Sequence, residues 1–184
     1  MISRLLVFLL VVVALPRITL SQELFDDSFE TDPTAAGPTE SGNAQIYQHA
    51  AAPWTIHFTP GYAWDSSVAR TGKSSVRLGE ADGLVAMNSR SLSISPGDNV
   101  DAEVWGKAQG ATGDVYILLD FYGPKGAIKA VRGGTPQGPL ASVAGSLGGT
   151  TDWIRLLVRG VAPAGADHAV VSLVSERNKG LVWF

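Results

Sequence analysis

Two segments in which apolar and polar residues alternate constrain the fold of this chain most. Both lie between Thr151 and Leu173, and one turn separates them. The apolar positions that share a face are Ile154, Leu156 and Val158 in the first run and Ala169, Val171 and Leu173 in the second. A period of two is typical of half-buried strands, and Pro163 with Gly165 between the runs predicts a turn. The sequence therefore predicts two strands, paired or facing each other. Because such a pair cannot bury its apolar side alone, an all-β sandwich or barrel should complete it.

The same alternation recurs along the chain and is clearest at Val100–Lys107 and Val115–Tyr122. Shorter strands are expected within Leu24–Glu30, Tyr47–Trp64, Val76–Leu78 and Leu92–Ile94, with a weak one around Leu140–Ala144. After residue 21 no capped helical period of useful length occurs. The expected fold class is therefore all-β and antiparallel.

The first 21 residues have the order of a secretory signal peptide. Arg4 precedes an apolar run from Leu5 to Leu15, and Thr19–Ser21 is a small-residue step ahead of Gln22. Pro16 interrupts the apolar run well short of the roughly 18 residues that a membrane span needs. Cleavage after Ser21 would leave residues 22–184 as a single domain in a secreted protein, located outside the cell, in a periplasm or on the cell surface.

Composition narrows the possible partners. Loss of Arg4 and Arg17 with the leader leaves 12 basic residues against 17 acidic ones, a net charge of −5. A mildly acidic chain without a basic run is a poor ligand for nucleic acids or anionic lipids. Because the chain has no cysteine, it has no disulfide framework, no thiolate metal site and no lipid-bearing cysteine.

The order of glycine turns and aromatic residues resembles the jelly-roll carbohydrate-binding modules found beside secreted cellulases and xylanases. The residues that carry this resemblance are Phe29-Glu30, Trp54, residues 72–78, Ser95-Pro96-Gly97, Trp105-Gly106-Lys107, Phe121-Tyr122-Gly123, Trp153, residues 163–166 and residues 180–184. The resemblance covers nearly all of the chain after residue 21. It implies an antiparallel β-sandwich of galactose-binding-domain-like, jelly-roll type that binds polysaccharide without catalysis.

The resemblance also implies a structural calcium ion that ties the start of the domain to its end. Its ligands in this sequence would be Glu30, which follows Phe29, and backbone oxygens of the turn at Gly72 and Ser74. In the family the last strand continues into a pair of aspartates, whereas this sequence stops at Phe184. We therefore expect the free carboxylate of Phe184 to lie near Glu30 and the Gly72 turn, and an Asp-Asp extension to raise the thermal midpoint, more so with calcium.

Sugar binding requires aromatic rings for stacking and polar side chains for hydroxyl groups. Such residues share the outward parity of the two clearest strands: Glu103, Trp105, Tyr116, Asp120 and Tyr122. The competing interpretation is that these aromatics pack under loops or against the other sheet. Trp54, Trp153 and Trp183 are interpreted as core residues.

Two carboxylates, Glu103 and Asp120, could instead form a glycosidase pair if their strands are neighbours, since such pairs stand about 5 to 9.5 Å apart. Solvated acids on a strand face are the commoner explanation. The histidines lack the close spacing of a metal pair, and the Gly72-Lys73-Ser74 turn lacks the earlier glycine of a phosphate-binding loop.

The sequence thus favours a secreted, non-catalytic module that binds a polysaccharide or glycan by aromatic stacking and hydrogen bonds on a concave sheet face. The first alternative is a structural or protein-binding β-sandwich of a cell-surface assembly, with other modules or proteins as partners. The second is a small secreted glycosidase.

Overall fold

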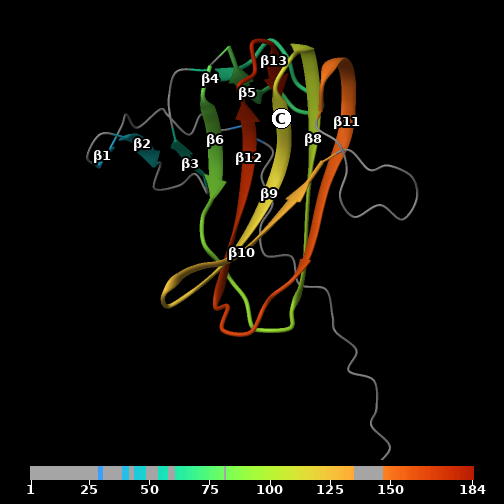
Figure 1. Cartoon of the computed structure of the whole chain (residues 1–184). Helices are drawn as coiled ribbons and strands as arrows, with labels where there is room; N and C mark the ends of the chain where they lie inside the picture. Colours follow the sequence, from blue (N-terminus) through green and yellow to red (C-terminus); the bar gives the residue numbers. More distant parts are fainter. Residues whose placement is uncertain are drawn as a thin grey trace, which may run out of the picture.

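The computed structural model describes residues 29–30, 39–41, 44–48, 54–57, 61–80, 82–134 and 147–184 as two antiparallel β-sheets (Figure 1). The leader and the weak strand expected around Leu140–Ala144 lie outside these residues, as does most of the strand expected within Leu24–Glu30. Within the described ranges, no helix has the length and apolar character to cross a membrane.

The larger sheet contains eight strands. In spatial order, seven of them are β1 (Thr39–Ser41), β2 (Ala44–Gln48), β3 (Trp54–His57), β6 (Leu84–Ser89), β12 (His168–Glu176), β9 (Asp114–Gly123) and β10 (Gly126–Gly133). The eighth, β7 (Leu92–Ser93), pairs with the start of β12. Because β9 lies between β12 and β10, it is a central strand and β10 is an edge strand.

The smaller sheet contains five strands. Its order is β11 (Gly149–Val161), β8 (Asn99–Ala111), β13 (Leu181–Trp183), β5 (Ser75–Gly79) and β4 (Tyr62–Asp65). Two 13-residue strands, β8 and β11, pair along most of their length. This sheet places β11 at one edge and β4 at the other.

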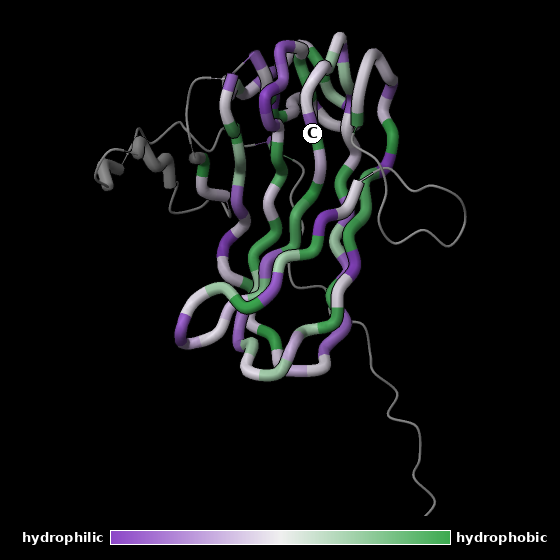
Figure 2. Tube along the Cα trace, viewed as in Figure 1, coloured by the Kyte–Doolittle hydropathy of each residue, from purple (hydrophilic) through white to green (hydrophobic). Residues whose placement is uncertain are grey.

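Strand alternation produces the core between the sheets. Along β9, Val115, Ile117, Leu119 and Phe121 are at most 1% exposed, whereas the residues between them are partly exposed. From the smaller sheet, Val76, Leu78, Leu156, Val158 and Val182 join the same buried cluster. In Figure 2 hydrophobic colour runs along the central strands and hydrophilic colour gathers at the connecting turns. The all-β sandwich expected from the sequence is confirmed.

The two runs around Pro163 form β11 and β12, which belong to different sheets and therefore face each other rather than pair. The same is true of β8 and β9, which a short turn at Thr112-Gly113 joins across the sandwich. Three strands, β1, β6 and β10, were not expected from the sequence.

The last strand begins at Leu181, as expected, and lies between β8 and β5. Beyond it, Phe184 exchanges two backbone hydrogen bonds with Val76, at 2.8 and 3.0 Å. Trp183 and Phe184 are each 4% exposed, so the final residues are buried as expected. Of the three tryptophans interpreted as core, Trp54 and Trp183 are buried but Trp153 is only partly so.

Candidate functional site

The structure divides the five residues expected to form one sugar-binding face. Tyr116, Asp120 and Tyr122 lie on β9 and point outward from the larger sheet, whereas Glu103 and Trp105 lie on β8 in the smaller sheet. The shared parity was correctly recognised, but the chain crosses from one sheet to the other between β8 and β9. A single face containing all five residues is therefore wrong.

The outer surface of the larger sheet around β9 is called the β9 face below. It consists of Tyr116, Asp120 and Tyr122 together with Arg132 of β10 and His168 of β12. The registers place them in one layer, because His168 is the cross-strand partner of Tyr122 and Arg132 is the partner of Leu118, between Tyr116 and Asp120. Sequence reasoning missed Arg132 because β10 was not expected, and it did not assign His168 to the site.

At one end of the β9 face two rings form a parallel, offset stack. The centroids of Tyr122 and His168 are 5.2 Å apart and their planes differ by 8°. Asp167 orients the imidazole, with its Oδ1 2.5 Å from Nδ1 of His168. This stack occupies one face of each ring, so the opposite side of Tyr122 is not covered by His168. Burial, followed by the nearby charge of Asp120, raises the pKa of Tyr122, which keeps its hydroxyl neutral.

At the other end, Tyr116 holds an arginine. The Arg132 guanidinium carbon lies 3.9 Å from the Tyr116 ring centroid, a cation–π geometry, and Nη2 is 3.4 Å from Oδ1 of Asp114. The Tyr116 hydroxyl donates to Oε2 of Glu176 at 3.4 Å. Burial and then the charge of Glu176 raise the pKa of Tyr116. The guanidinium is thereby fixed on the sheet surface.

Between these two ends lies Asp120, a partly buried carboxylate. Its cross-strand neighbours are Ala130 on β10 and Val170 on β12, and neither has a side chain that can donate a hydrogen bond. Desolvation by burial raises the pKa of Asp120. No hydrogen bond or ion pair reaches this carboxylate from within the described ranges.

The outer surface of the smaller sheet has a different character. Arg70 covers the ring of Trp105, with its guanidinium carbon 3.7 Å from the ring centroid. Ion pairs between β8 and β11 occupy the surface on both sides of it: Asp101–Arg159 at 3.1 Å, Glu103–Arg155 at 3.5 Å and Lys107–Asp152 at 2.7 Å. Since exposed pairs contribute about 0 to 1 kcal/mol each, this ladder is mainly a solvated strand surface.

The glycosidase pair suggested by the sequence is also wrong. Glu103 and Asp120 project from the outer surfaces of two different sheets. Stacked sheets pack about 10 Å apart, and both side chains point away from that interface, so the carboxylates cannot act on one bond.

The candidate calcium ligands Glu30 and Gly72 do come together. The Lys73 backbone N–H donates to both carboxylate oxygens of Glu30, at 2.9 and 3.2 Å. A Cβ atom at residue 72 would collide with Oε1 of Glu30, so this contact requires Gly72, whose φ is +69°. Ser74 is buried beside this turn. Glu30 therefore secures the turn by accepting hydrogen bonds from its backbone, and no group of three or more acids, histidines or cysteines suited to a metal occurs in the described ranges.

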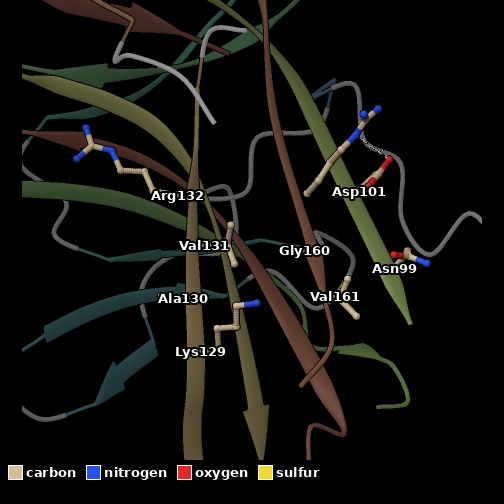
Figure 3. Close-up of a pocket in the computed structure, with 9 residues that line it drawn as sticks. Asn99, Asp101, Lys129, Ala130, Val131, Arg132, Gly160 and Val161 are labelled. Carbon is tan, nitrogen blue, oxygen red and sulfur yellow. Dashed lines mark ion pairs between the residues drawn. The ribbon is translucent and has the colours of Figure 1, made fainter. Parts of the chain in front are cut away.

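A recess of ≈ 670 Å³ opens where the edge strands β10 and β11 part. The two strands meet where the Leu157 N–H donates to the carbonyl oxygen of Gly134 at 3.0 Å. Farther along β10, Lys129 and Val131 project toward Gly160 and Val161 of β11, while Arg132 turns away (Figure 3). A charged side chain such as Lys129 on an edge strand discourages pairing with another chain. Arg132 contributes to the lining of this recess as well as to the β9 face, so the two adjoin along β10.

No protein-family model matches the chain, and no curated protein sequence matches it. Solved structures do. The C-terminal family 22 carbohydrate-binding module of Clostridium thermocellum Xyn10B matches with a TM-score of 0.50 and 14% identity, over 82% of this chain and 92% of that module. The CBM22-1 xylan-binding domain from Paenibacillus barcinonensis Xyn10C matches with a TM-score of 0.50 and 12% identity, over 71% of this chain and 80% of that domain.

A similar sandwich occurs within the enzymatically active domain of bacteriophage CBA120 tailspike protein 4, at a TM-score of 0.50 and 13% identity. That match covers 71% of this chain but only 18% of the tailspike chain. At such identities the likeness concerns the fold. The chain has the jelly-roll β-sandwich fold of the carbohydrate-binding modules, as the resemblance in its sequence implied.

Proposed function

We propose that this protein is a secreted, non-catalytic carbohydrate-binding module that holds a polysaccharide or glycan against the β9 face. The observation that carries the proposal is the arrangement of Tyr122, Asp120 and Arg132 on one outward surface of a rigid sheet. The fold supports the same conclusion, because solved modules with this sandwich include one described as a xylan-binding domain.

The chemistry of the β9 face suits a sugar. A pyranose has an apolar C–H face, which can stack on the ring face of Tyr122 opposite His168. Its hydroxyl groups can donate to Asp120 and accept from Arg132, which the Tyr116 ring and Asp114 hold in place. Tyr122 and Asp120 lie on the central strand β9, and Arg132 of the edge strand β10 is held by Tyr116 and Asp114, so these groups are preorganised and lose little conformational entropy on binding.

The division of Glu103 and Asp120 between the two sheets supports a non-catalytic role, because these two acids cannot act together on one glycosidic bond. The second role we propose is structural. A calcium ion would bind Glu30 and oxygens of the Gly72–Ser74 turn, with backbone groups and water completing the roughly six to eight oxygen ligands that calcium prefers.

A glycan array screened with residues 22–184 tests the proposal, followed by titration of the best ligand into two variants. Tyr122→Ala removes the stacking ring and should weaken binding by about tenfold or more, since one aromatic–sugar contact is comparable to an aromatic pair of about 0.5 to 1.5 kcal/mol plus its buried area. Trp105→Ala on the opposite sheet is the matched control and should bind like the wild type. No ligand on the array, or equal loss in both variants, would contradict the proposal.

A further inference from the structure

The charged groups of the larger sheet's outer surface form pairs that leave Asp120 out. Asp114 contacts Arg132 at 3.4 Å, Glu176 contacts Arg177 at 3.4 Å, and Asp167 contacts His168 at 2.5 Å. The remaining titratable groups near Asp120 are the hydroxyls of Tyr116 and Tyr122 on its own strand. Within the described ranges, Asp120 is thus the acid on this surface without a basic partner.

The position of Asp120 argues against a merely structural role. Charges protect the edges of sheets, but β9 is a central strand, where aspartate is a poor β-former. Burial also disfavours its charged form, and no donor compensates this cost in the part of the chain that the structure describes. A polar group kept in a central strand against local stability is typical of a functional site.

The surface is also deficient in cations. Asp114, Asp120, Asp167 and Glu176 face Arg132 and Arg177, so with a neutral imidazole at His168 the formal charge is −2. Both arginines already contact a carboxylate, while Lys125 lies in the turn between β9 and β10 and Lys129 projects toward the recess, so an anionic ligand over the middle of β9 would not meet a free cation beside Asp120. It would instead meet the uncompensated carboxylate of Asp120.

We propose that Asp120 makes the β9 face selective for uncharged glycans: its carboxylate accepts hydrogen bonds from sugar hydroxyls and repels glycans that carry carboxylate or sulfate groups. This inference rests on the proposed function and specifies its ligand class. Hydrogen bonds to an ionised acceptor are about twice as strong as neutral ones. A like charge brought against a partly desolvated carboxylate is a repulsive element that discriminates between otherwise similar ligands.

Polymers that share a backbone but differ in charge provide the test. The pairs are hydroxyethyl cellulose with carboxymethyl cellulose, arabinoxylan with glucuronoxylan, and fully methyl-esterified polygalacturonate with polygalacturonate. We expect the wild type to retain the neutral member of at least one pair about tenfold more strongly than its acidic partner. Asp120→Asn should weaken neutral binding several-fold and narrow this ratio, because the amide is uncharged and a weaker acceptor. Asp152→Asn, which removes a carboxylate from the opposite sheet, should change neither quantity.

The pH dependence of polymer binding provides a second test. A purely structural role of Asp120 would not produce this dependence. Binding of the neutral polymer by the wild type should weaken as the pH falls and Asp120 gains its proton, starting above the ordinary pKa of 3.8 because burial raises the pKa of this group. Asp120→Asn should lack this component of the pH profile.

Equal binding of neutral and acidic polymers, or equal effects of Asp120→Asn and Asp152→Asn, would overturn the selectivity. Binding of an acidic polymer that is lost in Lys129→Ala would also overturn the selectivity, because it would place the ligand in the recess between β10 and β11. If the wild type binds no polymer and no arrayed glycan, the proposed function itself fails. The selectivity fails alone if glycans bind the β9 face without regard to charge.

Discussion

Asp120 and Asp65 are carboxylates whose surroundings shift their pKa values in opposite directions, and each predicts a pH-dependent stability. For Asp120, burial raises the pKa above 3.8. For Asp65, burial alone would raise the pKa, but hydrogen bonds from the Ser67 hydroxyl, the Trp183 indole and the backbone N–H groups of Ser67 and Val68 outweigh it and lower the pKa to about 2. The first residue therefore costs stability when ionised, and the second contributes stability when ionised.

Asp120→Asn should raise the thermal midpoint by a few degrees at pH 7, because the folded state no longer holds a desolvated charge. A folded-state pKa above the unfolded value means that the wild type regains stability as the pH falls through it. The difference between variant and wild type should therefore shrink toward pH 3.8. Thermal unfolding from pH 3.5 to 7 measures it, and a variant less stable than the wild type at pH 7 would contradict the assignment.

Asp65→Ala should have the opposite effect at pH 7. It removes the acceptor of the Trp183 indole N–H, which donates to Oδ2 at 2.8 Å, and leaving a buried donor unpaired costs about 1 to 3 kcal/mol. Because the pKa of Asp65 is lowered, its contribution to stability is complete above pH 3.8 and is lost as the pH falls from about 3.8 to 2. Denaturant unfolding should show a large difference in the free energy of unfolding between wild type and Asp65→Ala at pH 7, and a small one at pH 2. Asp65→Asn, which keeps an acceptor oxygen, should have an intermediate free energy of unfolding at pH 7.

Among the strands, those with one solvated side could be predicted from sequence and the others could not. The clear alternation at Val115–Tyr122 became β9, since one side of β9 is core and the other is surface. By contrast, β6 buries four of its six residues and so hardly alternates, and β10 is an exposed edge strand bounded by glycines. The sheet that a strand joins depends on pairing with strands far away in the sequence, and alternation within the strand does not reveal it. For this reason the five expected site residues were assigned to one face, although β8 and β9 belong to different sheets.

Where β11 crosses the core, Gly160 allows the close approach of the two sheets. A Cβ atom there would lie 2.9 and 3.0 Å from two ring carbons of Phe121 and 3.2 Å from a methyl group of Leu119. Because Phe121 is fully buried, Gly160→Ala should destabilise the protein by about 1 to 3 kcal/mol, the usual cost of overpacking.

Urea unfolding checks the Gly160 prediction, with Gly148→Ala as the control. A Cβ atom at residue 148 would meet no atom within 4 Å, so this variant should be neutral or slightly stabilised. Equal midpoints for the two variants would mean that the sheets do not approach each other at Gly160 as described.

At the scale of the whole molecule, Glu30 and Phe184 converge on one region, since the Gly72 turn held by Glu30 leads into β5, which pairs with Phe184 through Val76. If calcium binds there, adding it should raise the thermal midpoint, by an amount equivalent to about 2.7 kcal/mol at a hundredfold excess over the dissociation constant. Glu30→Gln should lose most of this response. A wild-type midpoint that is the same with calcium and with a chelator would contradict the proposed ion.

The central claim is that glycan binds the β9 face rather than the opposite sheet, and the tryptophans test it directly. All five lie elsewhere: Trp54 faces the core, and Trp64, Trp105, Trp153 and Trp183 belong to the smaller sheet. Titration of a ligand followed by amide and indole NMR shifts should therefore move the amides of β9, β10 and β12 around Asp120 and leave the five indole signals in place. Movement of the Trp105 indole signal together with β8 amides, while β9 stays unchanged, would place the ligand on the smaller sheet and contradict the account.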